Sequence, residues 1–121
     1  MAASHYGLDN LTAIVDRNGL QISGSTEQVM AQESQRERWS AFGWHVLEAN
    51  GNDVTEISAK LAEAAGFRGK PCVIIAHTVK GYGVSFMENR AEWHHKVPDR
   101  EQYETAMAEL DRKLKEAMEN E

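Results

Sequence analysis

The sequence predicts an α/β fold, with a small three-stranded, mostly parallel sheet flanked by helices. Three short apolar runs rich in β-branched residues, at 11–15, 44–49 and 72–79, alternate with amphipathic segments. That alternation is typical of βαβ units and a parallel sheet. The third run is almost unbroken in its hydrophobicity, which favours a strand covered on both faces. A chain of 121 residues is long enough for a single domain, 1–121, with a modest core.

Two helices are predicted from their starting residues. Residues 34–37 and 53–56 are capping boxes, in which Ser or Asp stands three positions before Glu. We therefore expect a short helix over 34–43 and a longer one over 53–66, each ended by glycine. The apolar stripe predicted for the longer helix is Val54, Ile57, Leu61 and Ala64 or Ala65.

The remaining segments are predicted as two loops and a carboxyl-terminal helix. Residues 25–31 and 80–97 are the loops, and residues 98–121 form an amphipathic helix whose acidic end, 116–121, frays. The apolar face of this helix is Tyr103, Met107, Leu110, Leu114 and Met118. It serves either as core packing or as a seam for a partner.

Composition excludes several classes of protein. The net charge of −6 and the pI near 5.4 disfavour binding to nucleic acid, whose phosphates an acidic chain repels. No apolar run approaches the ~20 residues that a membrane span requires. The single cysteine, Cys72, opens a strand-like run and is expected to be a buried, inert thiol. We expect a cytoplasmic protein without a membrane segment.

Turn residues follow the first strand and form the first candidate site. Asp16, Arg17, Asn18 and Gly19 stand at its carboxyl end, where ligands collect in open parallel sheets. Carboxylate and amide oxygens suit Mg²⁺ and its phosphate-bearing partners. The same residue types also make ordinary turns, because Asn and Asp bond their own backbone and Gly accepts positive φ. The tetrad alone leaves both interpretations open.

The wider sequence resembles a known family. Residues 8–22, LDNLTAIVDRNGLQI, resemble the second half of the thiamine-diphosphate motif of transketolase, as found in amino-terminal subunits of split bacterial transketolases. Segments 41–46 and 69–89 and the pair at 93–94 agree with the family in order. The resemblance implies part of the thiamine-diphosphate-binding fold. The family's upstream Gly-Asp-Gly, whose Asp is the principal Mg²⁺ ligand, does not occur here, and residues 1–6 resemble a helix interior. We therefore expect the carboxyl-terminal half of such a subunit.

The resemblance also assigns roles to five residues. Asn18, through its side-chain amide, and Leu20, through its backbone carbonyl, are expected to ligate Mg²⁺ bound to the cofactor diphosphate. Gly19 lets the backbone turn closely around the metal, and Ile22 packs against the cofactor rings. His94 matches a catalytic histidine that faces the substrate, a role suited to a side chain that titrates near neutrality.

The other histidines are predicted to be structural or unassigned. The family commonly has Gly where His95 stands. A metal site made by the pair His94 and His95 is disfavoured, because adjacent side chains of an extended segment point to opposite faces. His45 and His77 lie in predicted strands and are expected to be structural.

The activity implied by the resemblance is transfer of a two-carbon ketol unit between sugar phosphates, with thiamine diphosphate and Mg²⁺ as cofactors. In the family the site forms between two chains, so a homodimer or a partner transketolase subunit is expected, and this chain alone is expected to be inactive. One alternative is a non-catalytic α/β interaction module that self-associates through an unpaired strand edge. Another is part of a related enzyme such as deoxyxylulose-phosphate synthase, although residues 80–83 and 93–94 favour transketolase.

Overall fold

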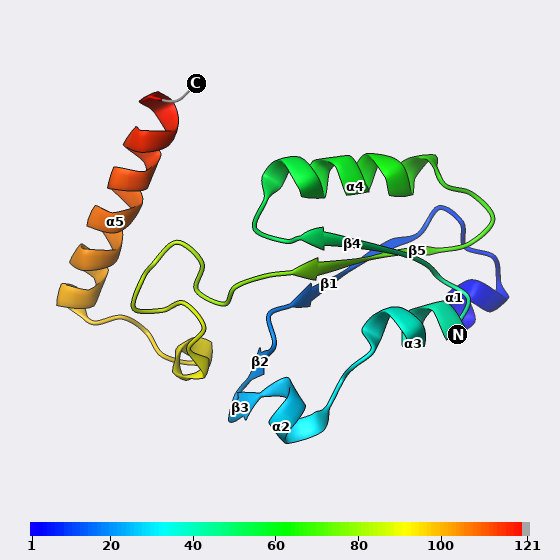
Figure 1. The fold of residues 1–121 in the computed structure, drawn as a ribbon, viewed down its shortest axis with the longest axis horizontal. Coiled ribbons are helices and arrows are strands. Elements are labelled where there is room, and N and C mark those ends of the chain that lie inside the picture. Colours follow the sequence, from blue (N-terminus) through cyan, green and yellow to red (C-terminus); the bar gives the residue numbers. More distant parts are fainter. Residues whose placement is uncertain (120–121) are drawn as a thin grey trace.

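A three-stranded parallel sheet forms the centre of the protein (Figure 1). The structure is a computed structural model and describes residues 1–119. The strand order is β1 (Thr12–Arg17), β5 (Cys72–His77), β4 (His45–Asn50), so the last strand in sequence is central. Both strand pairs are parallel, with residue 72 opposite residues 12 and 45. The predicted α/β class and three-stranded sheet are confirmed.

Helices cover the two faces of this sheet. In Figure 1, α4 (Val54–Gly66) lies on one side of the strands and α3 (Gln35–Ala41) on the other. Both begin at the predicted caps: the Ser34 hydroxyl accepts the Glu37 N–H at 3.3 Å, and Asp53 accepts two backbone N–H groups of α4. Each cap replaces a hydrogen bond that the first helical turn lacks. The short α1 (Ala2–His5) precedes the sheet.

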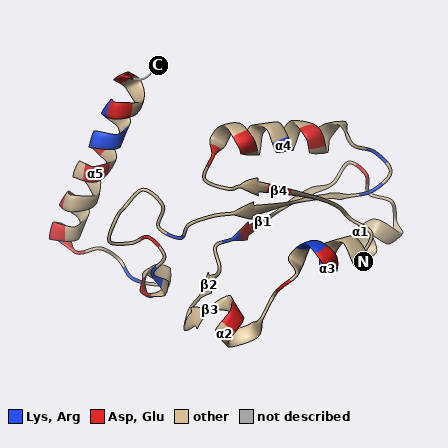
Figure 2. Cartoon of the chain, viewed as in Figure 1, with Lys and Arg blue, Asp and Glu red and all other residues tan. Residues whose placement is uncertain are grey.

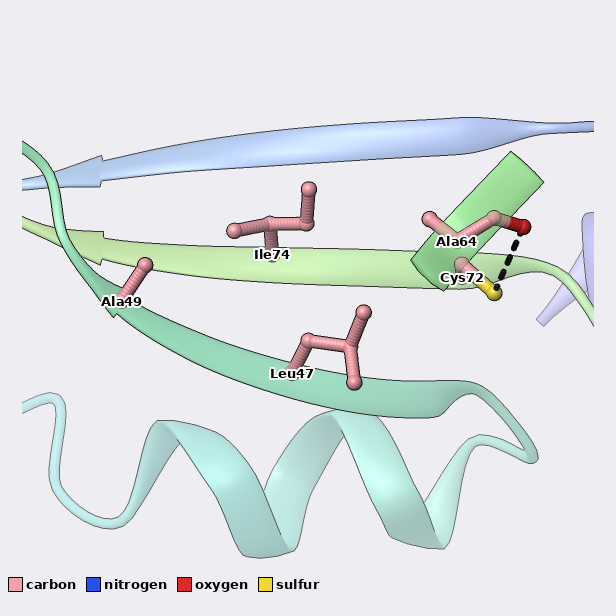
Figure 3. Packing of buried hydrophobic residues seen from close by; sticks show 5 residues of the cluster. All are labelled: Leu47, Ala49, Ala64, Cys72 and Ile74. Atoms are coloured by element: carbon pink, nitrogen blue, oxygen red, sulfur yellow. Dashed lines mark hydrogen bonds between the residues drawn. The ribbon is translucent and has the colours of Figure 1, made fainter. Parts of the chain in front are cut away.

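The core lies between α4 and the sheet. All of β5 except His77 is buried, as the unbroken apolar run predicts. Figure 3 shows Leu47 and Ala49 of β4 facing the same layer as Ile74 of β5. Cys72 donates a weak S–H bond to the Ala64 carbonyl at 3.9 Å, and burial raises the pKa of its thiol. Cys72 is therefore a packing residue, as expected.

One edge of the sheet is apolar and uncovered within the described residues. The outer edge of β1 pairs with no strand of residues 1–119. Ile14 lies opposite Ile74 in register yet is 54% exposed, whereas Ile74 is fully buried.

The stripe predicted for α4 is only partly buried: Val54 is 81% exposed, because it is the first residue of the helix and lies beyond the core layer. That part of the prediction is wrong.

The segment after β1 contains more structure than predicted. A two-residue hairpin, β2 (Leu20–Gln21) with β3 (Gly24–Ser25), is followed by α2 (Thr26–Met30). The loop predicted over 25–31 is therefore wrong for most of its length. Ser25 caps α2 by accepting the Gln28 N–H, so Ser-x-x-Gln at 25–28 was a helix signal in the sequence. A 3₁₀ turn, η1 (Ala91–His94), likewise interrupts the loop predicted over 80–97.

The last helix, α5 (Arg100–Glu119), stands apart from the sheet (Figure 1). It is attached to the loop after β5: Glu109 accepts the N–H and the hydroxyl of Ser85, and Lys113 donates to the Gly83 carbonyl at 2.9 Å. The apolar stripe from Tyr103 to Met118 is 39–69% exposed, so it is not core packing. Helix continues to Glu119, and residues 120–121 of the predicted frayed end lie outside the described residues.

Candidate functional site

The turn after β1 is shaped by its own side chains. The Asn18 Oδ1 atom accepts the backbone N–H of Leu20 at 2.9 Å, which closes an Asx turn. Gly19 has φ +73°, a conformation that other residues rarely adopt. The expected ordinary-turn chemistry is therefore present. One lone pair of the Asn18 oxygen remains available to a ligand.

Backbone hydrogen bonds hold this turn against α2. The Gly19 carbonyl accepts both the N–H of Thr26, at 2.9 Å, and its hydroxyl, at 3.3 Å. Thr26 is buried, so these bonds are protected from water. Ile22, at the tip of the β2–β3 hairpin, is 61% exposed. The four residues assigned to cofactor binding thus lie on one short loop at the carboxyl end of β1.

The structure also brings the predicted catalytic histidine to this loop. The 3₁₀ turn η1, which ends at His94, packs against β2. Trp93 anchors η1 by donating its indole N–H to the Phe86 carbonyl at 3.1 Å. His94 and His95 lie edge to face with ring centroids 4.4 Å apart, because this segment is a turn and not an extended strand. The expectation that the two side chains point to opposite faces is wrong.

The donors present fit only part of a magnesium site. Asn18 and Leu20 offer an amide and a carbonyl oxygen, both neutral, whereas Mg²⁺ is held mainly by carboxylates and substrate phosphates. The nearest carboxylate along the chain, Asp16, accepts the Thr78 hydroxyl. Among residues 1–119 no cluster of three or more His, Cys, Asp or Glu is placed to hold a metal ion. A bound diphosphate and a further carboxylate would have to complete the set.

Comparison with known proteins identifies the family. Residues 1–117 match the family described as transketolase, thiamine diphosphate binding domain. The chain belongs to this family. It is 53% identical over 114 residues to an apulose-4-phosphate transketolase subunit of Phocaeicola vulgatus, covering 94% of this chain and 41% of that protein. Over 110 residues it is 44% identical to the protein of the same name from Actinobacillus succinogenes, covering 91% of this chain and 40% of that protein.

Solved transketolases share the fold. The chain superposes on transketolase from Campylobacter jejuni with a TM-score of 0.84 and 31% identity, covering 91% of this chain and 17% of that one. For the Pichia stipitis transketolase complex with sedoheptulose-7-phosphate the TM-score is 0.82 at 27% identity, covering 91% and 16%. The chain thus spans about two fifths of the length of these two bacterial relatives and less of the solved transketolases. These names favour transketolase over deoxyxylulose-phosphate synthase.

In the described part of this transketolase-family chain, no helix is long and apolar enough to span a membrane.

Contacts between strand ends were not predicted from sequence. Asn52 Oδ1 accepts the Val79 N–H at 2.7 Å, and the His77 carbonyl accepts the Gly51 N–H at 2.8 Å. These bonds join the β4–α4 turn to the end of β5. Asn52 therefore makes a structural contact between the two segments. Its partner lies 27 residues away, so no local pattern could have revealed the contact.

A second set of contacts that was not predicted from the sequence links β4, β5 and α3 through hydrogen-bonded side chains. His77 Nε2 lies 2.9 Å from Glu48, and Arg36 of α3 binds the same carboxylate. These two hydrogen bonds, with that from His77 the larger influence, hold the pKa of Glu48 below its ordinary value. His45 stacks on Phe67 with ring centroids 3.9 Å apart. Both histidines therefore make structural contacts, as their place in strands predicts.

Proposed function

We propose that this chain supplies the downstream part of a transketolase-type thiamine diphosphate site. One observation carries the proposal: the loop with Asn18, Gly19, Leu20 and Ile22 lies at the carboxyl end of β1, and the turn bearing His94 packs against it. In this proposal Asn18 and Leu20 ligate Mg²⁺, Gly19 allows close approach of the diphosphate, and Ile22 contacts the cofactor rings. His94 holds the substrate or moves a proton.

The reaction that this site serves is transfer of a two-carbon ketol unit between sugar phosphates. Thiamine diphosphate supplies the carbanion chemistry, and the protein binds, orients and excludes water. The substrates are sugar phosphates, as in the Pichia stipitis complex with sedoheptulose-7-phosphate. The partner is a second transketolase chain, which fits the naming of the bacterial relatives as subunits of a transketolase. The cytoplasmic location stays a prediction from the sequence.

Isothermal titration calorimetry tests cofactor binding. The purified chain is titrated with thiamine diphosphate in excess Mg²⁺, alongside Asn18→Ala and the control Asn10→Ala. Asn10 is exposed and precedes β1, so its loss removes an equivalent amide away from the loop. Because the donors of this chain fit only part of a metal site, we expect saturable heat once a chain carrying the Gly-Asp-Gly part of the motif is present. Asn18→Ala should abolish this heat and Asn10→Ala should retain it. Equal heats for the two variants would contradict the assignment of Asn18.

The ketol-transfer assay tests the need for a partner. Because the donors in this chain fit only part of a metal site, we expect no transfer by the purified chain alone. Transfer is expected once a chain carrying the Gly-Asp-Gly part of the motif is added, and His94→Ala should then lower the rate while leaving cofactor heat unchanged. Activity of the chain on its own would overturn this part of the proposal.

A self-associating interaction module is the second candidate. The unpaired edge of β1 and the exposed Ile14 favour it, because such edges recruit further strands. Gel filtration with light scattering separates the two candidates cheaply. A concentration-dependent dimer without cofactor heat supports the module, whereas a monomer at high concentration counts against it.

A further inference from the structure

Arg17 is a charged side chain that is largely shielded from solvent beside the candidate cofactor loop. It is the last residue of β1, and its side chain is only 15% exposed. A buried guanidinium requires partners, because an unpaired charge away from water is costly. The identity of those partners shows what Arg17 holds in place.

Two carboxylates from the following segment bind this guanidinium. Arg17 Nη2 lies 3.6 Å from Glu27 Oε1 of α2, and it also pairs with Glu33 in the linker to α3. Figure 2 shows the basic end of β1 and, on the segment that follows β2 and β3, acidic residues on α2 and on the linker to α3. Glu27 Oε1 also accepts the Gln32 N–H at 3.3 Å. Both ends of the segment 27–33 are therefore bound to the Arg17 guanidinium.

The same guanidinium lies against the turn. A Cβ atom placed on Gly19 would lie 3.8 Å from Arg17 Nη1, so the guanidinium comes close to the turn without crowding it. Arg17, Asn18 and Thr26 line a common cavity of about 200 Å³. The Gly19 carbonyl binds Thr26, the residue next to Glu27. Arg17 thus lies beside the turn and, through Glu27, contacts the helix that binds it.

We propose that Arg17 is a positioning residue that fixes the Asn18–Leu20 turn by clamping α2 and its linker to the end of β1. The relevance of this clamp to the cofactor rests on the proposed function. Arginine suits the task because its planar fork can bind two carboxylates at once, which the single ammonium of lysine does less well. Neither carboxylate is a proposed ligand, so the effect on the cofactor is transmitted through the backbone of the turn.

Amide hydrogen exchange of the full chain tests the clamp without any cofactor. The two reporters are the N–H groups of Leu20 and Thr26, which donate to Asn18 and Gly19. Arg17→Met removes the charge-assisted bonds to Glu27 and Glu33, which contribute more than neutral hydrogen bonds. The turn should then open more often, and we expect both N–H groups to exchange roughly tenfold faster or more. Exchange at the buried strand residue Ile74 should be unchanged.

Matched variants separate positioning from general stability. Arg36→Met removes another arginine–glutamate pair, that with Glu48, and should leave the two reporters unchanged. Arg17→Lys should restore part of the protection that Arg17→Met loses. If Arg17→Met does not fold, Glu33→Gln removes the same ion pair from its more exposed side and should accelerate both reporters. Unchanged exchange in Glu33→Gln and Arg17→Lys alike, or equal acceleration in Arg36→Met, would overturn the proposal.

Cofactor affinity provides a second and separate readout. In the calorimetric titration, Arg17→Lys should weaken the binding of thiamine diphosphate with Mg²⁺, while Arg36→Met should not. If the unmodified chain binds no cofactor even when a chain carrying the Gly-Asp-Gly part of the motif is added, the proposed function fails, but the exchange experiment still decides whether Arg17 orders the turn. If the chain binds and Arg17→Lys binds equally well, positioning by Arg17 is refuted while the cofactor site stands.

Discussion

Ile14 and Ile74 are paired in register on neighbouring strands, yet only Ile74 is buried. Replacing Ile74 by Ala removes three carbon atoms, worth about 2.4 kcal/mol at ~0.8 kcal/mol each. The cavity left behind adds a further cost, so we expect the free energy of unfolding to fall by about 2–5 kcal/mol, the usual range for such a substitution. Ile14 is 54% exposed, so Ile14→Ala should cost only about 1 kcal/mol.

Urea unfolding, followed by circular dichroism, measures both losses. With a slope of about 2 kcal/mol per molar urea, the midpoint should fall by roughly 1–2.5 M for Ile74→Ala and by about 0.5 M for Ile14→Ala. Equal shifts for the two variants would refute the reasoning, because the free face of β1 would then be covered in solution. The measurement at two protein concentrations shows whether another copy provides that cover.

Three further predictions concern the junctions between elements. Hydrogen bonds from the Ser85 hydroxyl and, to a smaller extent, from its backbone N–H lower the pKa of Glu109. The stabilisation that these bonds give to the attachment of α5 is therefore complete above the ordinary carboxyl pKa, and it is lost as the pH falls through the lowered pKa. NMR of Ser85 against pH checks this, and Glu109→Gln should remove the pH dependence. Gly51→Ala should destabilise by about 1–3 kcal/mol in urea unfolding, because the added Cβ overlaps Thr78. Asp53→Ala should cost about 1 kcal/mol in thermal unfolding, since it removes the cap of α4; an unchanged transition would exclude capping.

The strands and the two capped helices could be predicted because their signals are local. Alternating segments, capping boxes and glycines specify an element from residues within a few positions of one another. The two-residue strands β2 and β3 are too short for any periodicity, and their pairing depends on the turn that joins them. Val54 was misassigned because helical spacing cannot show where the core layer ends.

In the candidate site, too, features with a local sequence signal could be predicted, whereas contacts between distant residues could not. Asn18 and Gly19 became candidates because they follow a strand and match the family motif, and His94 became a candidate through the family resemblance alone. Arg17 was named with this turn, but its ion pairs could not be predicted, because Glu27 and Glu33 lie 10 and 16 residues further along the chain. Ion pairs that cross between elements depend on packing, and the residues of the pair show no spacing that a sequence pattern could reveal.

The strand order has a consequence for how this chain is made. Among residues 1–119, β1 and β4 pair only with β5, so no hydrogen bond between these three strands can form until the ribosome has released residues 72–77. The first strand must then close a loop of some sixty residues, which slows folding relative to local contacts. Until that moment Ile14 and Leu47 have no strand of residues 1–119 beside them. The nascent chain therefore carries two apolar strands that await a third, and this interval is when it is most exposed to aggregation.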